Sequence, residues 1–219
     1  MTAMTSRSPS DRSEASLLSA MMSMAPPGIR LGCRTIRVGD EDLLLPEEQH
    51  AVTTRNLEAR RASGAARHLA RDLMAELGHP VVAIGRGRFG QPIWPAGVVG
   101  LLAHDRMMAV AAVVSGPANL SLGIDVEPAE PLPDDAVPLV MTAGDELGTA
   151  SRHLAGRILF AAKEAIYKAV YPLDGIILNH DDVVVSLAAS CGRTRAGPVV
   201  RLYWCISPRI VVLAIPSGR

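Results

Sequence analysis

The stretch ILFAAKEAIYKAVY, residues 158–171, has the composition and spacing of a helix that packs into a core. Three charged residues, Lys163, Glu164 and Lys168, interrupt it. Charged side chains are seldom buried unless they are paired or bind something. Glu164 and Lys168 are four residues apart, in the order that favours an ion pair on one helix face. Such a pair at the surface stabilises by only about 0.3–0.5 kcal/mol, so an ordinary salt bridge would also explain it.

A second acidic motif, GIDVE (123–127), lies in a predicted strand over residues 120–128. Asp125 and Glu127 are two residues apart, so both side chains leave the same face of that strand. Two carboxylates on one face repel each other unless they are solvated or share a cation, and oxygen ligands suit Mg²⁺. The polar face of an edge strand explains the same pattern, and both interpretations stay open at this point.

Composition excludes several classes of protein. The 219 residues are 48% hydrophobic but only 3% aromatic, so the core must be aliphatic. Lys+Arg and Asp+Glu both number 22, and this balance argues against nucleic acid or a membrane surface as partner. The three cysteines lack metal-site spacing and are typical of a reducing compartment. No apolar run has transmembrane length, so we expect a cytoplasmic protein.

Helical and strand patterns follow one another in a way that predicts an α+β fold of two similar α/β halves. Helices are expected at 47–78, as two helices or one interrupted near Gly64, and at 152–170. Loops are expected at 85–97 and 128–150. Strands are expected at 98–103, 107–114, 120–128, 181–189, 198–207 and 209–215, the last one central. The predicted division is a disordered segment 1–24, an N-terminal half 25–115 and a C-terminal half 116–219.

Positively charged residues supply further candidates. His104 follows an apolar strand, where a histidine is also a common structural residue. Arginine binds phosphate through its planar fork, although a solvated helix face would also be rich in arginine. The dense cluster consists of Arg60, Arg61, Arg67, Arg71, Arg86 and Arg88.

Together these motifs resemble the paired signature of the 4′-phosphopantetheinyl transferases, (V/I)GxDxE followed by (F/W)xxKExxxK. GIDVE precedes FAAKEAIYKAVYP (160–172) by the expected interval. WPAGVVGLLAHD (94–105) is similar to the family's WPxGxxGSxxH element, and residues 59–78 are similar to its basic helix. The resemblance spans about residues 46–180 and points to the branch of the enterobactin-synthase D component and actinobacterial enzymes. It implies two α/β halves packed pseudo-symmetrically.

The resemblance implies an enzyme that moves 4′-phosphopantetheine from coenzyme A to a serine of an apo acyl, peptidyl or aryl carrier protein and releases 3′,5′-ADP. It implies Mg²⁺, with Mn²⁺ as the alternative, on Asp125, Glu127 and Glu164. The implied catalytic residues are Glu164, Lys168 and His104. The implied contacts to coenzyme A are Arg60, Arg67, Arg86, His104, Asp125, Glu164, Lys168 and Leu178. Expected partners are carrier domains of siderophore, polyketide, nonribosomal peptide or fatty-acid synthases, and a monomer is expected.

The sequence departs from the family pattern at two motif positions and in the segment 128–150, which is short and poorly matched where the carrier-protein contact is expected. Leu101 stands where the family has Ser or Thr, which removes a hydrogen bond to phosphate. Arg60 and Arg67 are seven residues apart instead of the expected eight, so Arg60 or Arg61 is the phosphate ligand. Lys163 is expected to contact coenzyme A or solvent.

Two alternatives remain at this point. Leu101 motivates a degenerate family member that binds coenzyme A or carrier protein without efficient turnover. A nucleic-acid-binding module on the arginine helix is the other, and zero net charge and scarce aromatic residues count against it.

Overall fold

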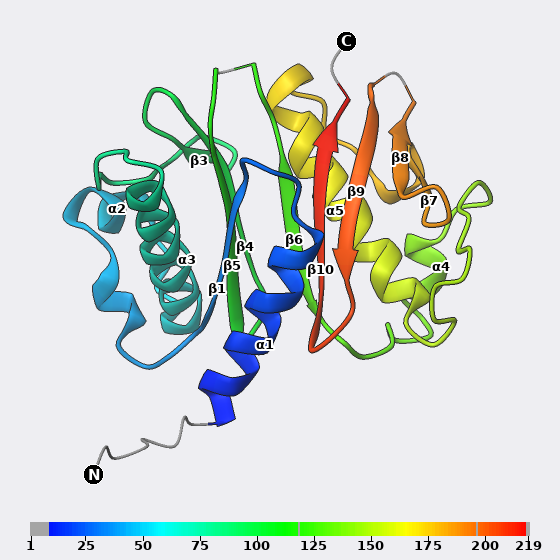
Figure 1. Cartoon of the computed structure of the whole chain (residues 1–219), viewed down its shortest axis with the longest axis horizontal. Coiled ribbons are helices and arrows are strands. Elements are labelled where there is room, and N and C mark those ends of the chain that lie inside the picture. The colour runs from blue at the N-terminus through cyan, green and yellow to red at the C-terminus, as the bar shows by residue number, and fades with distance from the viewer. Residues whose placement is uncertain (1–8, 118, 196, 218–219) are drawn as a thin grey trace.

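The computed structural model describes residues 9–117, 119–195 and 197–217 (Figure 1). Two antiparallel sheets stand side by side. The first has the strand order β1-β5-β4 and the second β6-β10-β9-β8-β7. The strands of the first sheet are β1 (Arg30–Thr35), β4 (Val98–His104) and β5 (Met108–Ser115). Those of the second are β6 (Gly123–Pro128), β7 (Val183–Ser186), β8 (Cys191–Thr194), β9 (Val199–Cys205) and β10 (Arg209–Pro216).

Each sheet carries one long helix. Helix α3 (Leu57–Glu76) packs on β1, β4 and β5, and helix α5 (Ala155–Asp174) packs on β6 and β10. The shorter helices are α1 (Pro9–Met24), α2 (Pro46–Ala51) and α4 (Val137–Val140), with 3₁₀ turns η1 (Asp40–Leu43) and η2 (His180–Asp182). A small hairpin joins β2 (Gly85–Arg86) to β3 (Pro92–Ile93). The mixed helix and sheet fold predicted from the sequence is therefore confirmed.

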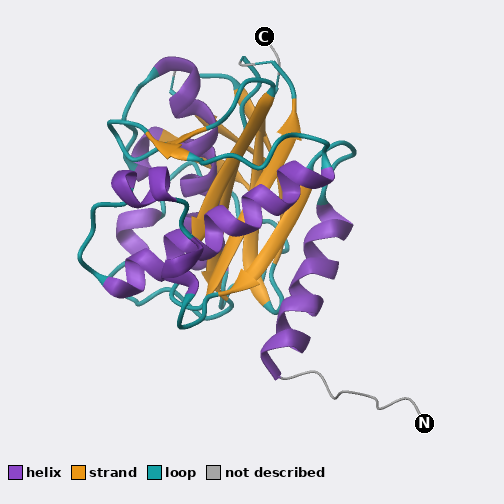
Figure 2. Ribbon diagram, turned by 90° about the vertical axis from the view of Figure 1, so that its left-hand side faces the viewer, coloured by secondary structure: helices purple, strands orange, loops and turns teal. Residues whose placement is uncertain are grey.

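The other faces of the two sheets form a shared apolar layer. Alternate residues of a strand face opposite sides. On β10, Ile210 and Val212 join the cluster around α5, whereas Val211 and Leu213 join a cluster that also contains residues of β1, β4 and β5. Figure 2 shows α1 on this shared face, opposite the other long helices.

Helix α1 corrects the prediction of disorder for residues 1–24. Residues 9–24 are helical, and Leu17 and Met21 are fully buried against both sheets. A Glu14 carboxylate oxygen accepts a hydrogen bond from the Thr35 backbone at 2.8 Å. The two core residues are four apart, but Leu18 and Met22 beside them are apolar and exposed, so the sequence shows a short apolar run and not one helix face. The remaining predicted residues, 1–8, lie outside the described part of the chain.

The helical tract 47–78 is two helices, separated at residues 52–56 and not near Gly64. Gly64 lies within α3, where a Cβ atom would overlap the Asp40 carbonyl. The glycine therefore allows close packing against η1 instead of ending a helix.

All six predicted strands are present, and β6, β7 and β9 are shorter than predicted. The last strand, β10, is paired on both sides as expected. The sequence analysis missed β1, β8 and the hairpin within 85–97. Helix α5 begins three residues later than predicted and continues past Pro172 to Asp174, where Gly175 ends it with φ 70°. None of the described helices is long and apolar enough to cross a bilayer.

Candidate active site

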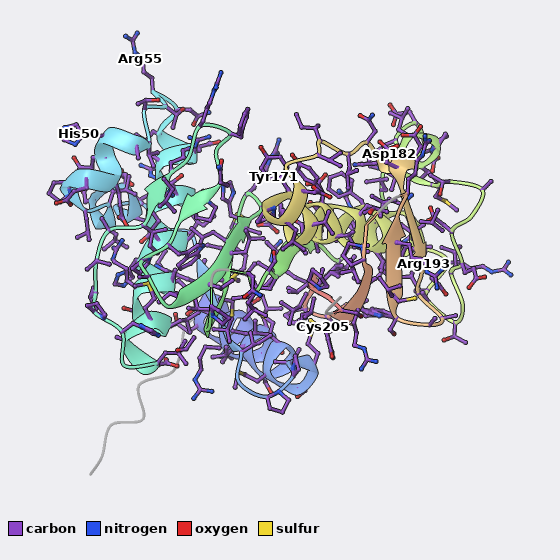
Figure 3. The ribbon with its side chains drawn as sticks, turned by 90° about the horizontal axis from the view of Figure 1, so that it is seen from above. His50, Arg55, Tyr171, Asp182, Arg193 and Cys205 are labelled. Carbon is purple, nitrogen blue, oxygen red and sulfur yellow. The ribbon has the colours of Figure 1, made fainter. Side chains whose placement is uncertain are left out.

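The two sheets meet where β4 approaches β6, and a cavity of about 430 Å³ opens at this junction. It is lined by β4, the β2–β3 hairpin, residues 120–122 and the C-terminal part of α5. The lining is mainly apolar and includes Trp94, Leu101 and Tyr167, while Lys168 supplies a cation. Figure 3 shows Tyr171, another lining residue, between the part of the molecule carrying His50 and the part carrying Asp182.

Asp125 and Lys168 join β6 to α5 beside this cavity. The Lys168 Nζ donates to Asp125 Oδ1 at 2.6 Å. A Cβ on Gly123 would overlap the Ala165 carbonyl, so glycine at the start of the GIDVE motif lets the strand and the helix approach closely. Lys168 therefore pairs across to the strand, not with Glu164 on its own helix as predicted.

Asp125 is buried in an unusual electrostatic setting. Its side chain is only 9% exposed, and burial raises the pKa of this carboxyl to about 6. Lys168 opposes that shift, while the negative charges of Glu127 and Glu164 add to it. Its second oxygen, Oδ2, is buried and has no hydrogen-bond partner within the described residues. Buried polar atoms are usually paired, so this unpartnered oxygen marks a place where a ligand would satisfy the carboxylate once the covering atoms move.

The other two candidate metal ligands also lie beside nitrogen-bearing side chains. Glu127 Oε2 accepts from Arg157 Nη1 at 2.9 Å, and burial raises the pKa of Glu127 although Arg157 opposes it. Glu164 Oε1 lies 3.5 Å from Nε2 of His180.

The three carboxylates are not arranged as a finished metal site. In the part of the chain that the structure describes, no group of three or more His, Cys, Asp or Glu side chains is placed to hold a metal ion. The negative charges of Glu127 and Glu164 nevertheless both act on the Asp125 carboxyl and raise its pKa. Asp125 also carries an unpartnered oxygen. The donor set suits a hard divalent cation, provided that Glu127 turns from Arg157 and Glu164 uses the oxygen that does not face His180.

His104 lies at the end of β4, close to this charge centre. Its side chain is accessible to solvent, yet neighbouring protein atoms displace part of its hydration and lower its pKa. The positive charges of Lys168 and Arg67 lower that pKa further. Because these charges act on the imidazole, the structure brings His104, Lys168 and Arg67 into one neighbourhood.

The arginine cluster separates into structural and accessible members. Arg71 is buried and bonded to Glu48 at 2.6 Å, and Arg61 pairs with Glu41 at 2.9 Å. Arg67 is buried and donates to the Ile84 carbonyl at 3.0 Å, and burial lowers its pKa. Arg60 makes one longer contact, 3.3 Å to the Val52 carbonyl, and Arg86 is exposed on β2. Arg60 thus has no carboxylate partner among these contacts, whereas Arg61 has one.

Comparisons with known proteins agree with this geometry. Residues 46–114 match the 4′-phosphopantetheinyl transferase N-terminal domain, and residues 121–207 match the 4′-phosphopantetheinyl transferase superfamily. The chain is 38% identical over 156 residues to the 4′-phosphopantetheinyl transferase Npt of Nocardia iowensis, covering 69% of this chain and 70% of the relative.

Two further relatives are similar over longer spans. The Svp transferase of Streptomyces mobaraensis is 35% identical, covering 80% of this chain and 81% of its own. The PptT transferase of Mycobacterium tuberculosis is 33% identical, covering 78% and 85%. The chain belongs to the 4′-phosphopantetheinyl transferase superfamily. This confirms the family and the transferase class predicted from the sequence.

Within this phosphopantetheinyl transferase, Lys163 has a different place from the one predicted. It is 1% exposed, and its Nζ lies 2.8 Å from Asp145 Oδ2, so the expected contact with coenzyme A or solvent is wrong. Apart from Glu164, the residues around Lys163 on the helix are apolar, which was a signal of burial. Its partner Asp145 lies in a segment that the sequence shows only as an acidic loop. Leu178 packs against the core of the second sheet, and its predicted contact with coenzyme A stays a prediction.

Proposed function

We propose that this protein transfers the 4′-phosphopantetheine group of coenzyme A to the serine hydroxyl of an apo carrier protein and releases 3′,5′-ADP. The observation that carries the proposal is the buried Asp125–Lys168 pair, with its unpartnered carboxylate oxygen, beside a cavity between two sheets. The three relatives named as 4′-phosphopantetheinyl transferases support it. They do not favour the degenerate, non-catalytic alternative.

The reaction forms a bond from the serine oxygen to phosphorus and breaks the bond from phosphorus to the 3′,5′-ADP oxygen. Such transfers depend mainly on positioning and on neutralising charge. Glu164 accepts the serine proton, and its solvent-reachable carboxylate, 31% exposed, can meet a docked substrate. Lys168 stabilises the transferring phosphate, because its ammonium already lies at the edge of the cavity.

Coenzyme A is held on the other side by positive charge. Arg60, Arg67, Arg86 and His104 bind its phosphate groups near the 3′-phosphoadenosine end, and Leu178 lines the path of the pantetheine arm. The arginine side chains suit bidentate phosphate contacts. Leu101 contributes an apolar wall where a hydroxyl would add a hydrogen bond.

Asp125, Glu127 and Glu164 would hold a divalent cation, Mg²⁺ or alternatively Mn²⁺. A bound cation would supply positive charge to the diphosphate of coenzyme A. Glu127 must leave Arg157 to take part, and the atoms that cover the unpartnered oxygen of Asp125 must move aside.

The cellular context remains a prediction from the sequence. Carriers of siderophore, polyketide, nonribosomal peptide or fatty-acid synthesis are the expected acceptors, and we propose a cytoplasmic monomer.

The test is incubation with coenzyme A, Mg²⁺ and several apo carrier proteins, followed by intact-mass measurement of the carrier. A gain of one phosphopantetheine group is expected, and Glu164→Ala should abolish it while Glu58→Ala, an exposed change on α3, should not. No gain with any carrier, together with thermal stabilisation by coenzyme A, would instead favour a binding protein. Salt-sensitive retention of DNA without coenzyme A binding would favour the nucleic-acid module.

A further inference from the structure

A buried charge pair lies on the side of α5 away from the proposed chemistry. Lys163 and Asp145 have side chains 1% and 0% exposed, and their Nζ–Oδ2 distance is 2.8 Å. Lys163 also donates to the carbonyls of Val140 at 2.8 Å and His180 at 3.0 Å. Breaking a buried pair of this kind is strongly destabilising. The pair therefore fixes the segments around residues 140–145 and 180 against α5.

Asp145 extends this connection to the second sheet. Its Oδ2 accepts from the Thr142 backbone and its Oδ1 accepts from the Val185 backbone, both at 2.8 Å. Every contact is short and directed, so the backbone of the segment before β7 has little freedom. That segment includes η2 and its first residue, His180.

His180 connects the buried pair to the proposed base. Its carbonyl accepts from Lys163, while the Nε2 of its ring lies 3.5 Å from Glu164 Oε1. The ring also packs edge-on against Phe160, with centroids 5.5 Å apart. Lys163 and Glu164 are sequence neighbours on α5, and both contact the same residue, one through its backbone and one through its side chain.

We propose that His180 is a positioning residue that holds the Glu164 carboxylate toward the cavity-facing charge centre, and that the Lys163–Asp145 pair fixes His180 in place. The proposal rests on the proposed function, because Glu164 is the group whose orientation matters. A glutamate has three rotatable bonds, and a partly exposed one loses side-chain entropy when it is ordered. The His180 backbone is fixed by Lys163 and its imidazole packs against Phe160, so the residue supplies that order before substrate binds.

The experiment compares His180→Ala and His180→Gln with the wild-type protein in carrier modification at varied coenzyme A. Figure 3 shows His50 far from Asp182, the last residue of η2, so His50→Ala, at an exposed position on α2, is the matched control. His180→Ala should lower kcat about 10–100-fold, the usual effect of losing an outer partner of an active-site ligand. KM for coenzyme A should stay within about twofold, because His180 is not among the predicted coenzyme A contacts. His180→Gln should recover part of kcat, since its amide can donate from a similar position.

Binding of Mg²⁺ by calorimetry is the second readout, and it does not require turnover. His180→Ala should weaken Mg²⁺ binding about tenfold relative to the wild type and to His50→Ala. If the wild type modifies no carrier but the variants still differ in Mg²⁺ affinity, the proposed function fails and the positioning role stands. If His180→Ala keeps both kcat and Mg²⁺ affinity, the positioning role is wrong. It is also wrong if His180→Ala and His180→Gln lose kcat equally and only in proportion to a fall in Tm.

Discussion

Replacing Asp125 by Asn is expected to make the protein more stable while abolishing transfer. The pKa of Asp125 is about 6 in the folded protein against an ordinary value of 3.8. At about 1.4 kcal/mol per pKa unit, keeping this carboxyl ionised at neutral pH costs the folded state about 3 kcal/mol. Asparagine has the same shape without the charge, so it removes most of that cost.

Part of the gain is lost to the new amide group. The buried Oδ2 of Asp125 has no partner, so an NH₂ group in that position also has none, which costs about 1–2 kcal/mol. The net stabilisation at pH 7 is therefore about 1–2 kcal/mol. For a chain of this size that raises Tm by about 3–6 °C.

The raised pKa of Asp125 also predicts how the stability of the folded protein depends on pH. A raised carboxyl pKa means that the folded state binds more protons than the unfolded state between pH 3.8 and about 6. Its stabilising contribution is complete below pH 3.8 and is lost as pH rises through about 6. The advantage of Asp125→Asn over the wild type should therefore be larger at pH 7 than at about pH 4.

Thermal unfolding in a chelator at several pH values measures this difference, with Asp181→Asn, at an exposed aspartate within η2, as the matched control. Adding Mg²⁺ should stabilise the wild type more than Asp125→Asn. An Asp125→Asn protein that is less stable than the wild type at pH 7, with no pH-dependent difference, would refute this account of the buried carboxyl.

Three further changes test other parts of the structure. Leu101→Ser should tighten coenzyme A binding about tenfold by restoring a phosphate hydrogen bond, and an unchanged or weaker calorimetric affinity would contradict this. Glu48→Gln should lower the free energy of unfolding by about 3 kcal/mol in urea titrations, because Arg71 loses its charged partner within the core; a loss below about 1 kcal/mol would mean that the pair is dispensable. Gly123→Ala should cost about 1–3 kcal/mol by pushing α5 from β6 and should also reduce carrier modification, since Lys168 moves with the helix. Normal stability and activity would show that this close approach is not required.

The sequence predicted the residues of the site better than their pairing. GIDVE and KExxxK do lie together, but the contact between Asp125 and Lys168 joins residues 43 apart. Local spacing favoured the Glu164–Lys168 pair because only residues on the same helix can be related by helical periodicity. Lys163 can be buried because it pairs with Asp145. Asp145 lies in an irregular segment, and sequence periodicity does not predict the path of such a segment.

The secondary-structure elements also differ in how well the sequence predicts them. Strands β5 and β10 were readable because apolar runs identify buried strands. Strand β1 was missed because arginines lie at its start and near its end, and α1 was missed because only a narrow side of it is buried. Both depend on the shared apolar layer, which exists only once the two sheets have come together.

The position of α1 has a consequence for how the chain folds. This helix, at residues 9–24, packs on β1 and also on β9, at residues 199–205. Contacts between such distant residues form late, because a long loop must close before they stabilise anything. During synthesis, α1 is made long before β9, its second docking surface. Its apolar side, including Leu17 and Met21, therefore stays partly uncovered until β9 has been made, and its docking should be a late step of folding.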